Sequence, residues 1–372
     1  MATKTFTGAT DHNWSTSNNW SPSGQPASTD NAVFNSSSPA CTVTSGAVCA
    51  SVDFSGGGSS NYANTITFTN ALTVSGNVTL PTAATATFTG SGALIINASA
   101  TLTSNGQSCN VPLTLSGTSL TFTFTGNWTT TAALVLTITT AMTITGTGTL
   151  QAGSHTASGS TPSITLGTNV IITGTQNMGS VATSWTINGA SYTWTAQSGL
   201  TSVSCILAGT ATLIISGGST AFSGSYAVNC NLTFSGTMTI TGTLLFASSG
   251  TPTFNCSSAN ITTTGSTLQL GGSCTINATG MTGGFNNFTS TSSSYVISGT
   301  GLSIYGNLVG SVTGTSTVTL LAGATINTGS TININITIAG NITVSSNNFH
   351  FGGTNNPLLT WTSGTVTWTM RG

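Results

Sequence analysis

The segment that decides the fold is Thr121-Phe122-Thr123-Phe124-Thr125-Gly126, in which apolar and hydroxyl side chains alternate until a glycine ends the run. Side chains two residues apart in a β-strand point to the same face, so the alternation predicts a short strand with one apolar and one hydroxyl face. The closing glycine can supply the positive φ that a tight turn needs. The same unit (apolar, any, apolar, Ser or Thr, Gly) recurs at 72–76, 86–90, 113–117, 122–126, 142–146, 170–174, 213–217, 232–236, 238–242 and 295–299.

The composition favours strands and disfavours helices throughout the chain. No Asp, Glu, Lys or Arg occurs between residues 54 and 370, and the formal net charge of the 372 residues is −1. Glu, Lys and Arg are strong helix formers, whereas the Thr, Val and Ile that replace them favour pleated strands. We therefore expect an all-β chain with no helix longer than about two turns.

Two all-β architectures fit these short strands. In a right-handed parallel β-solenoid (β-helix), irregular coils stack about 4.8 Å apart, so Thr, Ser and Asn form ladders on the outside. In the alternative, tandem β-sandwich domains would place turns every 8–12 residues. The solenoid is preferred because the sequence shows neither linkers at domain-length intervals nor charged outer faces.

A solenoid must cap its two open ends. Residues 1–55 hold four of the five charged residues and two nearby tryptophans, and we interpret them as an N-terminal cap or attachment segment. Residues 56–345 are expected to form the solenoid body and residues 346–372 a C-terminal cap. The aromatic residues expected to cover the ends or to bind a neighbouring subunit are Trp14, Trp20, Phe34, Trp361 and Trp368.

The N-terminal segment carries a family resemblance. It reads Phe6-Thr-Gly-Ala-Thr-Asp-His-Asn-Trp14-Ser-Thr-Ser-Asn-Asn19-Trp20-Ser21, followed by Pro26 and Asp30-Asn-Ala-Val-Phe34. It resembles the start of β-solenoid proteins of bacterial viruses and of bacterial surface proteins with autotransporter-type β-strand repeats. The resemblance implies a virion structural protein (a fibre, spike or surface decoration), often trimeric. Enzymatic tailspikes of that kind carry carboxylates on the body, which this chain lacks.

The sequence offers little for catalysis or for cofactors. Glycoside hydrolysis needs two carboxylates that flank the bond, yet the three aspartates lie near the N-terminus, where we expect Asp11 and Asp30 to cap local backbone N–H groups. We interpret His12, His155 and His350 as surface or loop residues, since no nucleophile motif accompanies them. We therefore predict a non-enzyme without catalytic, cofactor-binding or metal-binding residues. We expect no nucleic-acid partner, because a basic face is missing, and no membrane span, because long apolar runs are missing.

Three further patterns are open to interpretation. Cys41 and Cys49 could pair across a hairpin, and Cys205, Cys230 and Cys256 are spaced as if stacked on successive coils, but all seven cysteines can equally be small buried residues. The Asn-x-Ser/Thr triplets at Asn77, Asn127, Asn231, Asn260 and Asn341 are as frequent as chance would give in so Asn- and Thr-rich a chain. Thr-x-Thr arrays, which some ice-binding solenoids use, occur at 65–69, 85–89, 121–125, 143–147 and 237–241.

The expected function is that of a non-enzymatic structural component of a bacteriophage particle, located in the virion and possibly in contact with host surface glycans. The near-zero net charge leaves little repulsion between copies, so we expect a homo-oligomer, by resemblance a trimer, in contact with other virion or surface-assembly proteins. The alternatives are a subunit of a bacterial extracellular or cell-surface filament, sheath or adhesin, and a Thr-array ice-binding protein.

Overall fold

The structure is a computed structural model in which the chain forms two compact units, unit 1 (Met1–Gly179) and unit 2 (Ser180–Gly372). Each unit is described by itself. The residues described are 1–56, 61–82, 86–138, 140–158, 163–177, 183–189, 191–198, 204–216, 225–235, 237–240, 243–246, 253–256, 259–263, 267–270, 274–277, 282–283, 287–290, 295–298, 300–304, 307–309, 312–320, 325–327, 331–339, 342–345, 350–351, 359–363 and 366–369.

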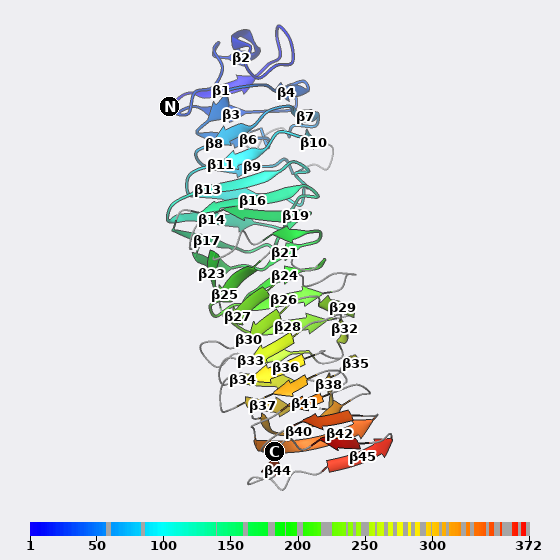
Figure 1. Ribbon diagram of the computed structural model, residues 1–372. Helices are drawn as coiled ribbons and strands as arrows, with labels where there is room; N and C mark the ends of the chain where they lie inside the picture. Colours follow the sequence, from blue (N-terminus) through cyan, green and yellow to red (C-terminus); the bar gives the residue numbers. More distant parts are fainter. Residues whose placement is uncertain are drawn as a thin grey trace. The chain divides into compact units, whose positions relative to one another are not determined.

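Unit 1 consists of short strands joined by turns (Figure 1). Its 3-10 turn η1 (Ser17–Asn19) is the only helical segment among the described residues of the chain, as the composition predicts. The strands are β1 (Thr3–Phe6), β2 (Trp20–Ser21), β3 (Asn31–Val33), β4 (Cys41–Val43), β5 (Ala47–Cys49), β6 (Ser51–Asp53), β7 (Thr65–Phe68), β8 (Leu72–Val74), β9 (Val78–Thr79), β10 (Thr87–Gly90), β11 (Leu94–Ile96), β12 (Ala100–Thr103), β13 (Leu113–Gly117), β14 (Leu120–Thr125), β15 (Trp128–Thr129), β16 (Ala133–Ile138), β17 (Ala141–Gly146), β18 (Leu150–Ala152), β19 (Ser154–Ser158), β20 (Ser163–Gly167), β21 (Val170–Ile172) and β22 (Gln176–Asn177).

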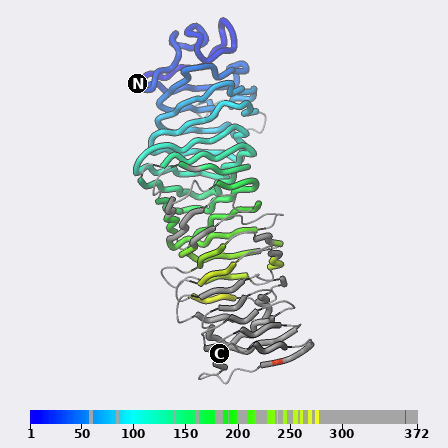
Figure 2. The backbone as a smooth tube through the Cα atoms, viewed as in Figure 1, coloured from blue at the N-terminus to red at the C-terminus, as the bar shows by residue number. Residues whose placement is uncertain are grey.

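The strands of unit 1 stack in parallel, one coil upon the next (Figure 2). Sheet A contains β1, β3, β6, β9, β12, β14, β17 and β20, and sheet C contains β5, β8, β11, β13, β16, β19 and β22. The third side of the coil is sheet B (β4, β7 and β10), then sheet D (β15, β18 and β21). Among the pairings of described strands, only β1 with β2 is antiparallel. The all-β parallel solenoid is therefore confirmed, and the tandem-sandwich alternative is wrong.

The core of unit 1 lies between the sheets and is built from the apolar half of each alternation. On sheet C the inward residues of successive coils form one column, in which every leucine is at most 2% exposed: Leu72, Leu94, Leu113 and Leu134. Full burial of one such side chain contributes about 1.5–3 kcal/mol. The columns hold the coils in register, because a shift by one residue would turn every leucine outward.

The glycine that ends the five-residue unit has two different functions. Gly146 takes a φ of +136°, as the turn interpretation predicts, and a Cβ there would also collide with the Phe124 backbone of the preceding coil. Gly76 is not at positive φ, so the turn explanation is wrong at this position. A Cβ on Gly76 would lie 2.7 Å from the Ala50 carbonyl oxygen, so here the glycine lets neighbouring coils approach.

The Asn-x-Thr triplets are a structural motif of the corners, and attributing them to chance was wrong. Each asparagine stands immediately before a strand or at its first residue, and its Oδ1 accepts a hydrogen bond from a backbone N–H one coil later. Such a bond ties a corner to the next level of the ladder. The described bonds run to Asn77 from Thr101 (2.9 Å), to Asn127 from Thr149 (3.0 Å) and to Asn231 from Thr253 (3.0 Å). Asn260 begins a strand, and Asn341 lies outside the described residues.

Unit 2 is also a ladder of parallel strands, for example Leu213 opposite Leu232 and Leu232 opposite Phe254. Its strands are β23 (Thr183–Asn188), β24 (Thr193–Ala196), β25 (Ser204–Ala208), β26 (Thr212–Ser216), β27 (Ser225–Asn229), β28 (Leu232–Ser235), β29 (Thr237–Ile240), β30 (Thr243–Phe246), β31 (Thr253–Asn255), β32 (Asn260–Thr263), β33 (Thr267–Leu270), β34 (Cys274–Asn277), β35 (Thr282–Gly283), β36 (Asn287–Ser290), β37 (Tyr295–Ser298), β38 (Thr300–Ile304), β39 (Asn307–Val309), β40 (Val312–Leu320), β41 (Thr325–Asn327), β42 (Thr331–Ala339), β43 (Ile342–Ser345), β44 (His350–Phe351), β45 (Leu359–Ser363) and β46 (Val366–Thr369).

Parallel pairing extends into both segments that we expected to be caps. β3 and β6 already belong to sheet A, so residues 1–55 contribute both loops and the first levels of the ladder. Within residues 346–372, β45 pairs with β42 and β46 pairs with β43, again in parallel.

Candidate functional site

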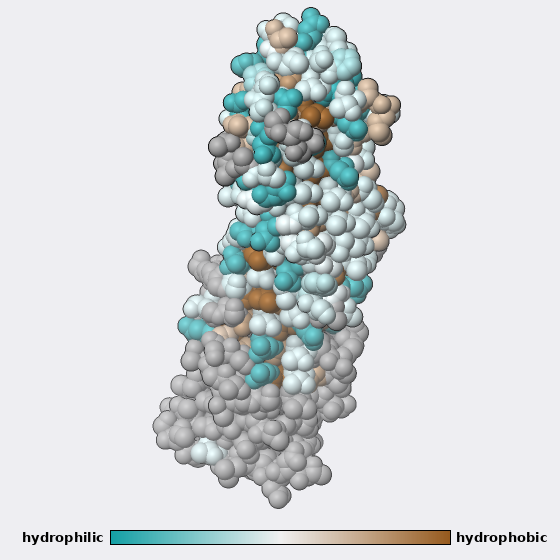
Figure 3. All heavy atoms as spheres, turned by 180° about the vertical axis from the view of Figure 1, so that it is seen from behind, coloured by the Kyte–Doolittle hydropathy of each residue, from teal (hydrophilic) through white to brown (hydrophobic). Residues whose placement is uncertain are grey.

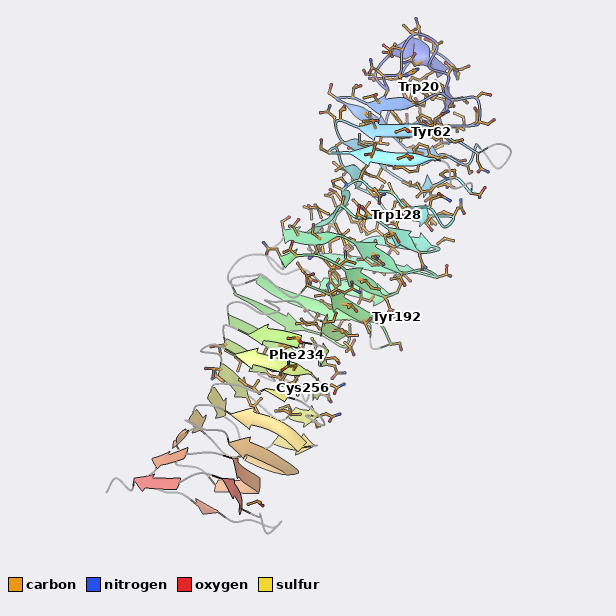
Figure 4. The ribbon with its side chains drawn as sticks, turned by 90° about the vertical axis from the view of Figure 1, so that its right-hand side faces the viewer. Trp20, Tyr62, Trp128, Tyr192, Phe234 and Cys256 are labelled. Carbon is orange, nitrogen blue, oxygen red and sulfur yellow. The ribbon has the colours of Figure 1, made fainter. Side chains whose placement is uncertain are left out.

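The first candidate region is an aromatic cluster near the N-terminus. Trp14 and Trp20 contact each other edge to face with ring centroids 4.8 Å apart, and Phe34 packs within 5.9 Å of both. The Trp20 indole N–H donates to the Trp14 carbonyl oxygen at 2.7 Å, and all three side chains are at most 2% exposed. Figure 4 marks Trp20 in this cluster, and Tyr62 and Trp128 at later levels of unit 1. The cluster is thus a core within the chain, and a role for these residues in binding another subunit stays a prediction.

An aspartate holds the loops around this cluster. Asp11 accepts hydrogen bonds from the Asn13 backbone N–H (2.7 Å), the Asn19 side-chain amide (2.6 Å) and the Thr16 hydroxyl (2.9 Å). These donors lower the pKa of the Asp11 carboxyl, the Asn13 N–H most of all. Asp30 likewise accepts from the backbone N–H groups of Ala2 and Ala27, which lowers its pKa. The prediction that both aspartates cap local backbone is confirmed.

The C-terminal aromatic residues lie on the last strands of unit 2. Trp361 is on β45 opposite Ile338, and Trp368 is on β46 opposite Val344. Their side chains lie outside the described part of the structure, so their capping role stays a prediction.

The interpretation of the histidines as surface residues is wrong for His155. His12 is exposed, but His155 is on β19, only 1% exposed, where it continues the inward leucine column after Leu134. Burial lowers its pKa to about 3, so the ring is neutral at pH 7. His350 is on β44, and its side chain is not among those described.

The cysteines are packing residues where the structure describes them. Cys41, Cys49, Cys109, Cys230, Cys256 and Cys274 are buried free thiols. Cys41 and Cys49 lie on strands of two different sheets, so the hairpin pairing is wrong. The predicted stacking is wrong as well, because Cys205 stands opposite Tyr226 in the next coil.

The second candidate region is a threonine lattice on the outward face of sheet A. Threonines of successive coils stand directly opposite one another in three columns, and all are exposed or half-buried. The columns are Thr79–Thr103–Thr125, Thr101–Thr123–Thr145 and Thr121–Thr143–Thr165. The lattice is regular because the buried residues behind it, Phe122, Ile144 and Leu166, follow one another at intervals of 22 residues.

The sequence identified only part of this lattice. It showed the arrays at 121–125 and 143–147, but not Thr101 or Thr165, which the 22-residue spacing would have located. The arrays at 65–69 and 85–89 belong instead to sheet B, where Thr65 stands opposite Thr87 and Thr67 opposite Thr89.

The outward face of sheet C has a different character. Its central column alternates aliphatic and hydroxyl side chains, all of them half-buried apart from the exposed Thr156: Val48, Thr73, Ile95, Thr114, Val135 and Thr156. Figure 3 shows one face of unit 1, where most described residues are near neutral in hydropathy and only scattered patches are strongly polar or apolar.

No protein-family model, curated protein or solved structure matches the chain. Within the described ranges, no helix is long and apolar enough to cross a membrane, and no group of three or more His, Cys, Asp or Glu side chains gathers as metal ligands would. The region's chemistry is therefore that of hydroxyl, amide and aliphatic surfaces.

Proposed function

We propose that this protein is a non-enzymatic structural component of a bacteriophage particle, present in many copies as a fibre, spike or surface decoration. The observation that carries the proposal is a parallel solenoid whose side chains carry no charge between residues 54 and 370. Copies of such a body do not repel one another at neutral pH. The N-terminal resemblance at residues 6–34 supports the particle as its location.

Copies of the chain meet, in this proposal, through the outward face of sheet C in unit 1. Val48, Ile95 and Val135 are aliphatic side chains that face outward and are only half-buried within one chain. Contact with a second copy would remove their remaining apolar surface from water, at about 25 cal/mol per Å². Sheet A offers no comparable aliphatic residues.

Catalysis has little to use in the described region. The ionisable groups of unit 1 are the capping aspartates, the buried His155 and buried thiols, and the pKa of the Cys49 thiol is raised to about 12 by burial. General acid–base chemistry at pH 7 needs an accessible group whose pKa lies near 7. Weak, polyvalent contact with host glycans would need no such group.

The test measures assembly and location separately. Light scattering on the purified chain should show an oligomer, and Val135→Lys should shift it to smaller species, whereas Gln151→Lys, a charge added to sheet D of the same unit, should not. A monomeric wild-type chain at micromolar concentration would contradict the assembly, and equal behaviour of the two variants would contradict the sheet C contact. Mass spectrometry of purified phage particles should find its peptides after chymotrypsin digestion, since trypsin could cut only at Lys4 and Arg371.

A further inference from the structure

We propose that the threonine lattice of sheet A binds the surface of ice. The inference is independent of the assembly proposed above, because it concerns a different face of unit 1. It rests on the geometry of the lattice, on the chemistry of threonine and on what the described surface does not offer to other partners.

The geometry is periodic in two directions. Along a strand, Thr121, Thr123 and Thr125 recur at every second residue, or about 6.6 Å. Across strands, Thr123 stands opposite Thr101 and Thr145, at the spacing of about 4.8 Å between neighbouring strands. A surface with two fixed repeats is complementary to a partner that is itself periodic, as a crystal is.

The side chains suit ordered water. Each threonine hydroxyl has one donor and two acceptor positions, and its methyl group displaces loosely held water. The branched Cβ restricts χ1, so a row of threonines loses little rotamer freedom when it binds. Ordering a single water molecule against a protein costs up to about 2 kcal/mol, and water already in a crystal has lost that freedom before the protein arrives.

The composition of the surface argues against other partners at this face. A charged group keeps its own strong hydration shell, as an ammonium does, but the lattice and all strands behind it are free of charge. Large apolar platforms, such as an exposed aromatic ring, are also missing, because the only exposed large hydrophobic residue in the described part of the chain is Met1. The half-buried aliphatic residues that suit a second copy lie on sheet C.

The experiment grows ice slowly from a solution of the fluorescently labelled full chain and measures the fraction of protein taken into the ice, together with thermal hysteresis. The wild-type chain should enter the ice and lower its growth temperature. Thr123→Lys places a charge at the centre of the lattice and should abolish most of both effects. Gln151→Lys, the same charge on sheet D, should leave both unchanged, and circular dichroism checks that each variant is folded.

Several results would overturn the proposal. One is exclusion of the wild-type chain from ice to the same degree as a protein without ice affinity. Another is equal loss in both variants, which would show a general effect of charge. Should Thr123→Lys fail to fold, Thr143→Lys tests the same lattice. Retention by crystalline cellulose or chitin that Thr123→Lys abolishes, with no uptake into ice, would assign the lattice to a saccharide and refute ice.

Discussion

Replacing His155 with leucine is expected to remove most of the acid sensitivity of unit 1. The histidine occupies a position in the inward column of sheet C that leucines occupy in the four preceding coils. Burial lowers its pKa to about 3, against an unperturbed value of about 6.5. The folded protein therefore holds the neutral ring, whereas the unfolded chain binds a proton as the pH falls below about 6.5.

The sign and size of the effect follow from this difference in proton binding. Stability is complete above the unfolded pKa and falls with decreasing pH, by about 1.4 kcal/mol per pH unit, until the folded pKa near 3 is reached. Between pH 7 and pH 4 the wild-type chain should lose on the order of 3 kcal/mol. Asp11 and Asp30 contribute in a lower window, because their pKa values are lowered and their stabilisation is lost only as pH falls below about 4.

Urea denaturation followed by far-UV circular dichroism at pH 7 and pH 4 measures the difference. The stability of His155→Leu should change little between the two pH values, while His12→Gln, a change at an exposed histidine, should lose as much as the wild type. A wild-type chain that is equally stable at both pH values would refute the buried, neutral state of His155. A His155→Leu variant that loses as much as the wild type would place the acid sensitivity elsewhere.

Three other predictions concern packing. Trp20→Ala should leave a cavity in the aromatic cluster, cost about 3–5 kcal/mol and raise hydrogen exchange in β1 and β3; unchanged exchange there would contradict the capping role. The thiols of Cys49 and Cys109 should resist iodoacetamide at pH 8 until the chain is denatured, because burial raises the pKa of each to about 12, and mass spectrometry would reveal any labelling of the native chain. Gly146→Ala should destabilise the chain by clearly more than Gly106→Ala, since both glycines have positive φ but only Gly146 faces a neighbouring coil; equal urea midpoints would argue against that close approach.

Much of the fold could be predicted from the sequence, because the alternation is local. Phe122 and Phe124 point inward and Thr121, Thr123 and Thr125 outward, as two-residue periodicity requires. The missing charged residues likewise predict the near absence of helix. Such patterns depend only on neighbours along the chain, so one sequence suffices to read them.

The site depended on contacts between coils, which the sequence alone does not display. The spacing of 22 residues holds from Phe122 to Ile144 to Leu166, but Val52 and Val78 are 26 residues apart, so no single period is visible along the chain. His155 was misplaced for the same reason: a solitary polar residue looks exposed until its partner in the previous coil, Leu134, is known.

The constant 22-residue interval behind the lattice has a consequence for how such a chain can change length. Removing one whole coil between Phe122 and Ile144 would set apolar residue against apolar residue and threonine against threonine once more, so the shortened protein keeps its chemistry with one level fewer. Removing a single residue instead would exchange the inner and outer faces of a strand. Gene duplications and deletions therefore act on this protein as on a ruler, in whole divisions, while the letters within each division drift.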